Sequence, residues 1–130
     1  MNNYALFIDD ERLPPDDGKN WVTAKSSKTA INLVEALGYP DFISYDHDLG
    51  GDDTSVEFLN WLIEQLVSEL DSGKITSKYA VDTITAHYVH SQNPVGKQNI
   101  EGKISSFVKA HRQTEDYHVA RSVALKDSSV

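Results

Sequence analysis

The chain of 130 residues contains no cysteine. Disulfide bonds, thiolate metal ligands and a cysteine nucleophile are therefore excluded. No apolar run approaches the roughly 20 residues that a membrane-spanning helix requires. The first residues are polar and show neither the basic segment nor the apolar core of a signal peptide. We therefore expect a cytoplasmic protein that does not contact a membrane.

Basic residues are scarce as well. Lysine and arginine together number 12, against 20 aspartate and glutamate residues, which gives a formal net charge of −8. Because proteins bind nucleic acid largely by neutralising its phosphates with basic side chains, we expect no extended nucleic-acid surface. A phosphate-bearing small molecule or a single RNA end is compatible with this charge, since helix N-termini and metal ions offset it locally. A protein partner is compatible with it too.

Short apolar runs alternate with helical patterns along the chain. Residues 4–8, 21–24 and 42–45 have the composition of buried strands. A fourth strand is expected in the second half of residues 79–89, after a connection over 74–78. Strands that alternate with helices predict a parallel sheet covered by helices on both faces.

Helices are predicted from apolar residues at helical spacing and from caps at the N-termini. Ser26 or Ser27 can cap a first helix that runs to about residue 37, and a second helix covers about 54–70. Thr54 and Glu57 have the spacing of a capping box, in which each side chain bonds the other residue's free amide. Asn93 is followed by proline and therefore caps a third helix.

The C-terminal part carries a weaker pattern. His111 is expected near the end of the third helix, and periodicity fades from residue 113 onward. Residues 117–125 suit either a further strand or an ordered tail. We expect one domain over residues 1–126, followed by a frayed tail at 127–130.

Three of the predicted strands end in polar, ionisable residues. The sequence DDE occupies 9–11 after the first strand, DHD occupies 46–48 after the third, and HSQN occupies 90–93 after the fourth. Ligands of open parallel sheets bind outside the carboxyl ends of the strands. If these strands are neighbours, their polar ends meet at one edge of the sheet and form the functional site.

Three blocks of sequence resemble a known family. They are LFIDDERLP at 6–14, FISYDHDLG at 42–50 and HSQNPVG at 90–96. Together they are similar to response-regulator receiver domains, and more closely to the divergent family named for cyclic-phosphate-processing receiver domains. The resemblance covers roughly residues 4–110.

The resemblance implies a three-layer, flavodoxin-like fold, whose parallel sheet has four or five strands in an order near 2-1-3-4. The first receiver helix is expected to be shortened or lost, because a loop with two prolines occupies 12–20. By motif, Asp9 and Asp10 match the acidic pair of receivers, Asp46 the phosphoacceptor and Ser91 the hydroxyl position. No Lys-Pro sequence ends a fifth strand, which argues against phosphorelay signalling.

The carboxylates of Asp9, Asp10 and Asp46 suit a hard cation. Mg²⁺ takes oxygen ligands and keeps waters or substrate phosphate in its remaining positions. We therefore predict that these three residues bind Mg²⁺. The alternative is that one carboxylate caps a loop or pairs with Arg12.

His47 and His90 are the candidates for proton transfer. Imidazole titrates near neutrality and exchanges protons with ester oxygens, so two histidines on neighbouring strand ends can act as acid and base. Asp46 joins them as a catalytic candidate, and Asp48 can orient one of the rings. The alternative is that each histidine is held by hydrogen bonds at its strand end without acting on a ligand.

Four further residues are candidates for phosphate binding: Ser91, Asn93, Gly96 and Arg12. The N-terminus of the helix after Asn93 offers free amides and a positive dipole end, and Gly96 lets a ligand approach. Capping explains Asn93 equally well. Arg12 either clamps a phosphate or neutralises the acidic cluster.

Taken with the resemblance, these residues predict a phosphoesterase or phosphate-end-processing enzyme. By the resemblance, its substrate is a cyclic phosphate on a nucleotide or RNA end, as in RNA repair, and its reaction is hydrolysis. One alternative is a non-catalytic module that binds a phosphorylated ligand or a protein partner. Another is a conventional receiver that is phosphorylated on Asp46.

Overall fold

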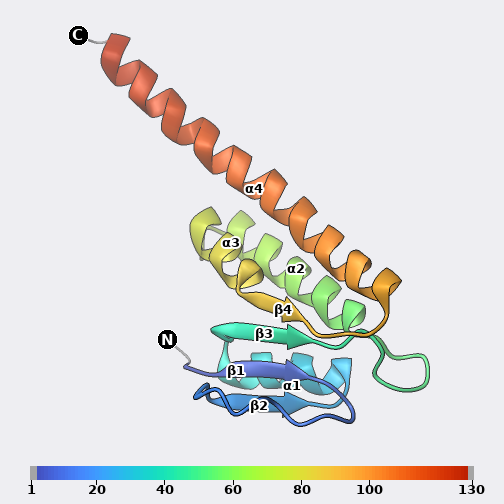
Figure 1. Ribbon diagram of the computed structural model, residues 1–130. Coiled ribbons are helices and arrows are strands. Elements are labelled where there is room, and N and C mark those ends of the chain that lie inside the picture. Colours follow the sequence, from blue (N-terminus) through green and yellow to red (C-terminus); the bar gives the residue numbers. More distant parts are fainter. Residues whose placement is uncertain (1–2, 129–130) are drawn as a thin grey trace.

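The computed structural model describes residues 3–128, and it describes the side chains of residues 3–112. Its four strands form one parallel sheet in the order β2-β1-β3-β4 (Figure 1). The strands are β1 (Ala5–Ile8), β2 (Trp21–Ala24), β3 (Phe42–Tyr45) and β4 (His87–Val89). The receiver-like α/β fold and the predicted strand order are confirmed, with four strands in the described part of the chain.

The helices are α1 (Ser27–Leu37), α2 (Ser55–Asp71), α3 (Ser77–Thr85) and α4 (Pro94–Ser128). Side chains from all four helices share one hydrophobic cluster with Leu6, Ile43 and Tyr45 of the sheet. Because side chains alternate along a strand, these three residues mark one face of the sheet. The described helices therefore pack over one face.

The opposite face of the sheet carries aromatic residues. Trp21 contacts both Phe7 and Phe42 there in T-shaped geometry, and it donates a hydrogen bond to Asp17. The prediction of helices on both faces is thus wrong for the described residues. Right-handed crossovers place the β1–β2 connection on this second face, and that connection, residues 9–20, contains no helix. The loss of the first receiver helix is confirmed.

Helix α3 was not predicted. Thr76 caps it by accepting a hydrogen bond from the amide of Tyr79, and Ala80, Val81 and Ile84 are buried along one side. The β-favouring run that suggested a strand from Ile84 begins inside this helix. Strand β4 is consequently only three residues long.

Helix α4 continues to Ser128 and projects beyond the rest of the domain (Figure 1). The alternative of a further strand over 117–125 is therefore wrong, because the ordered tail is a continuation of α4, and His111 lies inside the helix rather than near its end. The predicted frayed tail begins at the last turn of α4, and residues 129–130 lie outside the described residues. Although α4 has 35 residues, no helix in the described part is long and apolar enough to cross a membrane.

The caps are confirmed for two of the three predicted helices. Ser26 accepts a hydrogen bond from the amide of Thr29, and Asn93 accepts one from the amide of Gly96. Thr54 stands at the N-terminus of α2, but its side chain makes no capping bond. The Glu57 carboxylate instead accepts a hydrogen bond from Ser27 of α1, so the predicted capping box does not form.

Two leucine-to-alanine substitutions test the packing of the core through the free energy of unfolding. Leu62 is fully buried, whereas Leu13 is 89% exposed. We expect Leu62→Ala to lower the free energy of unfolding by about 2–5 kcal/mol, because it leaves a cavity in the core. Leu13→Ala removes the same atoms and should change it by less than about 0.5 kcal/mol. Urea unfolding measures both, and similar losses would contradict the packing described above.

Candidate functional site at the carboxyl ends of the strands

The backbone brings three polar residues to the same edge of the sheet. Each follows its strand directly and continues the hydrogen-bond ladder. The amide of Asp9 donates to Ala24, that of Asp46 to Ile8, and that of His90 to Tyr45, at N–O distances of 2.9–3.0 Å. Because adjacent parallel strands run in register, the side chains of these residues meet. The predicted convergence of the strand ends is confirmed.

Asp9 is the buried centre of the cluster, with 1% of its surface exposed. Its Oδ1 accepts hydrogen bonds from the amides of Glu11 and Arg12, at 2.8 and 2.9 Å. Its Oδ2 lies 2.9 Å from Nε2 of His90. Burial alone would raise the pKa of Asp9, but the two amides and the imidazole outweigh it and lower the pKa. Asp9 is therefore held as a carboxylate.

His90 is held on several sides. Its Nδ1 lies 2.7 Å from the hydroxyl of Ser44, and its ring stacks on Phe7 with the centroids 4.9 Å apart and the planes 3° from parallel. The guanidinium of Arg12 donates to the carbonyl of His90 at 3.1 Å. Both ring nitrogens of His90 are thus engaged by Asp9 and Ser44. In this arrangement the ring supports the carboxylate and has no free nitrogen for a substrate.

Ser44 is a site residue that sequence reasoning missed. It lies within β3 and is 4% exposed. The one signal for it was a hydroxyl inside an otherwise apolar and aromatic strand. A buried hydroxyl needs a hydrogen-bond partner, but only the pairing of β3 with β4 shows that this partner is His90.

Asp46 carries the least compensated charge of the cluster. Among the described residues, none donates a hydrogen bond to its carboxylate. Burial and then the negative charge of Asp9 raise its pKa, and the positive charges nearby only partly oppose them. A cation beside Asp46 would remove this electrostatic cost.

The cluster could hold a divalent cation, with some but not all of the predicted ligands. One ligand atom from each of Asp9, Asp46 and His90 lies within 4.8 Å of the other two. Asp10 is not in this group of the described residues; its Oδ2 faces Gly50, 3.4 Å from where a Cβ would stand. The structure thus keeps two of the three predicted ligands together and adds an imidazole.

His47 points to a different set of partners. Its Nδ1 lies 3.0 Å from Oδ1 of Asp48, as predicted for an orienting carboxylate. Oδ2 of Asp48 accepts a hydrogen bond from the side-chain amide of Asn93 at 3.2 Å. The bonds from Asn93 and His47 lower the pKa of Asp48. No described residue forms a hydrogen bond with Nε2 of His47, so this nitrogen is available to a ligand.

The first turn of α4 differs from the predicted phosphate cradle. The amides of Gly96 and Lys97 are bonded to the side chain and the carbonyl of Asn93, at 3.0 and 2.9 Å. Ser91 accepts a hydrogen bond from the amide of Asn93 at 3.1 Å. The space beside Gly96 holds the ring of His47. Helix capping already occupies the amides of Gly96 and Lys97, and the ring of His47 fills the space beside Gly96. Few amides of this turn are therefore left to bind a phosphate.

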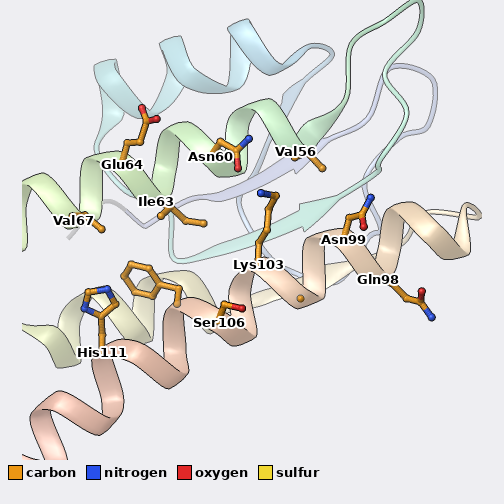
Figure 2. A pocket seen from close by; sticks show the side chains of 12 residues that line it. Val56, Asn60, Ile63, Glu64, Val67, Gln98, Asn99, Lys103, Ser106 and His111 are labelled. Atoms are coloured by element: carbon orange, nitrogen blue, oxygen red, sulfur yellow. The ribbon is translucent and has the colours of Figure 1, made fainter.

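A groove of about 930 Å³ lies between α2 and α4 (Figure 2). Glu64 of α2 and Lys103 and His111 of α4 are among the residues that line it. None of the predicted site residues takes part in its lining. The groove is therefore separate from the cluster at the strand ends.

Comparison with known families gives one clear result. Residues 4–106 match the family model described as Cyclic-phosphate processing Receiver domain. Comparison with curated proteins and with solved structures gives no significant match. The match includes all three blocks that carry the site, and it ends within α4.

Asp9 and Asp46 should respond to pH with opposite signs when divalent ions are absent. The lowered pKa of Asp9 stabilises the fold above about pH 4, the range of an unperturbed aspartate, and this stability is lost as the pH falls through the folded pKa. The raised pKa of Asp46 means that stability falls as the pH rises through it. We therefore expect Asp9→Asn to lower the free energy of unfolding at pH 7 and Asp46→Asn to raise it.

Urea unfolding in a chelating buffer measures both effects. Asp52→Asn is the matched control, since it removes the same charge from an exposed loop residue. The effect of Asp9→Asn should shrink as the pH falls below about 4, where an unperturbed aspartate is protonated. The effect of Asp46→Asn should shrink at a higher pH, as the pH falls through the raised pKa of Asp46. Changes of the same sign at pH 7 would contradict the electrostatics described for the pair.

Proposed function

The chain belongs to the family of cyclic-phosphate processing Receiver domains, and we propose that it hydrolyses a cyclic phosphate on a nucleotide or an RNA end. One observation carries this proposal. His47 is oriented by Asp48 through Nδ1, and its Nε2 has no partner among the described residues. His47 directly follows Asp46 in the chain, and its ring lies against Gly96 in the first turn of α4. A substrate phosphate would have to reach both Nε2 of His47 and the anionic cluster.

The proposed reaction adds water across one phosphorus–oxygen bond of the ring. Nε2 of His47 takes a proton from the attacking water, whose oxygen bonds to phosphorus. The bond from phosphorus to one ring oxygen breaks, and that oxygen takes up a proton from solvent. The product is a phosphate monoester with a free hydroxyl, and His47 then releases its proton.

His90 has a different role in this proposal from the acid–base role that the sequence predicts. Its nitrogens face Asp9 and Ser44, so it holds the Asp9 carboxylate in place beside Asp46. The catalytic proton transfer is then left to His47. Only one of the two predicted acid–base histidines acts directly on the substrate.

A divalent cation fits the carboxylates of Asp9 and Asp46. The sequence predicts Mg²⁺, and the uncompensated charge of Asp46 supports a cation there. When bound, such an ion would supply positive charge to the phosphate oxygens. His90 would either remain bonded to Asp9 or turn its Nε2 to the ion, with Ser44 holding the other nitrogen.

Arg12 is the proposed contact for the phosphate. Its side chain is 44% exposed, and its Nε lies 4.0 Å from Oδ2 of Asp9. One terminal nitrogen bonds the carbonyl of His90, and the other terminal nitrogen has no hydrogen-bond partner among the described residues, so it can contact an anion. The net charge of −8 makes this local cation useful for a phosphate-bearing ligand.

A non-catalytic binding module is the second candidate. The engagement of both His90 nitrogens favours it, because only one free imidazole remains at the site. Such a module would bind a phosphorylated ligand saturably and gain thermal stability from it without releasing product.

Removal of the His47 imidazole tests the catalytic proposal. We expect His47→Gln to lower kcat/KM for a 2′,3′-cyclic nucleotide by about 100-fold or more, because general acid–base catalysis contributes about that much. His111→Gln is the matched control, since His111 lies 15 residues beyond Gly96 on α4, roughly 22 Å away along the helix axis. Product release is followed by chromatography. Equal rates in wild type and His47→Gln would exclude His47 as the base.

Divalent ions should stabilise the protein through Asp46. We expect Mg²⁺ or Mn²⁺ to raise the melting temperature relative to EDTA, and an ion at 100 times its Kd adds about 2.7 kcal/mol. Asp46→Asn should abolish the increase, whereas Asp52→Asn should retain it. A thermal-shift titration measures this, and an equal increase in both variants would place the ion elsewhere.

A further inference from the structure

The first turn of α4 is built around the ring of His47. A Cβ atom at Gly96 would lie 2.3 Å from Cγ of His47, 2.6 Å from Cδ2 and 2.7 Å from Nδ1. Real Cβ atoms do not approach other atoms so closely. At Gly102, six residues further along α4, the same atom would meet nothing within 4 Å. The ring of His47 therefore rests on α4 at a place that only glycine leaves open.

Asn93 connects the same turn to Asp48. Its Oδ1 accepts a hydrogen bond from the amide of Gly96, and its Nδ2 donates one to Oδ2 of Asp48. Oδ1 of Asp48 then faces Nδ1 of His47. The four residues form a closed circuit, because His47 also packs against Gly96.

This circuit determines which nitrogen of His47 carries the proton. Asp48 already accepts the hydrogen bond from Asn93, and a carboxylate accepts hydrogen bonds only. Nδ1 of His47 must therefore be the donor. In the neutral ring the lone pair is then on Nε2, which is the form that a general base requires.

We propose that Asn93 and Gly96 are positioning residues, which fix His47 through Asp48 as the Nδ1–H tautomer with Nε2 directed to the substrate. That Nε2 of His47 acts on a substrate rests on the proposed function. The fixed ring and its tautomer are properties of the protein alone. Asn93 and Gly96, which the sequence suggested as phosphate ligands, thus act through His47.

One substitution separates positioning from helix capping. In Asn93→Asp, an oxygen still accepts the bond from the amide of Gly96, and aspartate is as good a cap as asparagine. The other oxygen replaces the donor that faces Asp48, so two carboxylates repel where one hydrogen bond existed. The variant retains the cap and loses the link to His47.

Gly96→Ala and Gly102→Ala form a second matched pair. Both place a better helix former in α4. Only the change at Gly96 meets the ring of His47. We expect Gly96→Ala to displace the ring and Gly102→Ala to leave it in place.

The measurement is NMR of protein labelled with ¹⁵N-histidine, at a pH where the rings are neutral. Long-range proton–nitrogen correlations report the tautomer of each ring, and the His47→Gln spectrum identifies the His47 signals. We expect Nδ1–H as the main form of His47 in wild type and Gly102→Ala. The Nε2–H form should become the main one in Asn93→Asp and Gly96→Ala. His87, whose partners are Thr85 and Glu101, should be unchanged in all four.

A wild-type ring in the Nε2–H form, or a tautomer that stays the same in Asn93→Asp and Gly96→Ala, would overturn the proposal. If Gly96→Ala does not fold, Asn93→Asp decides alone. In the cyclic-nucleotide assay, Asn93→Asp should lower kcat by about 10–100-fold with little change in KM. Absence of turnover in wild type would count against the proposed function, and the tautomers would still decide the positioning.

Discussion

The parallel ladder between β1, β3 and β4 is the constraint on which the site depends. The ladder continues one residue past each strand, through the amides of Asp9, Asp46 and His90. These residues are far apart in the sequence, yet hydrogen bonding puts them at the same level of the sheet. The buried Asp9 and the half-buried Asp46 are brought together as a result, and the energetic cost appears in the raised pKa of Asp46. The fold thereby creates a need for positive charge at this edge.

His90 and His47 have different surroundings and different roles in the site. His90 lies over Phe7 between Asp9 and Ser44, and its ring nitrogens contact the buried carboxylate and the hydroxyl. His47 lies outside this cluster, against α4, and it keeps one nitrogen free. His90 thus has a supporting role, whereas His47, in our proposal, transfers protons. The difference comes from the number of ring nitrogens that the protein itself occupies.

Sequence patterns were sufficient where a structure depends on neighbouring residues. The strand β3, the caps at Ser26 and Asn93, and the loop in place of the first receiver helix follow from local composition. Helix α3 was not predicted because Ile84 favours a strand locally. In the structure, Ile84 is buried on the side of α3 that packs against the core, and this packing stabilises the helix. The prediction of a capping box at Thr54 was wrong for a related reason. Glu57 found a partner in Ser27, which lies in another helix.

The sequence by itself determined the fold class, the family and the three polar strand ends, since periodicity and motif spacing are properties of the chain alone. Only the tertiary structure decided which side chains meet. It separated Asp10 from the carboxylate pair, joined Ser44 to His90, and filled the space at Gly96 with the ring of His47. Ser44 and His90 lie 46 positions apart in the sequence, and His47 and Gly96 lie 49 positions apart. These contacts depend on strand pairing and on the placement of α4, which no local pattern encodes.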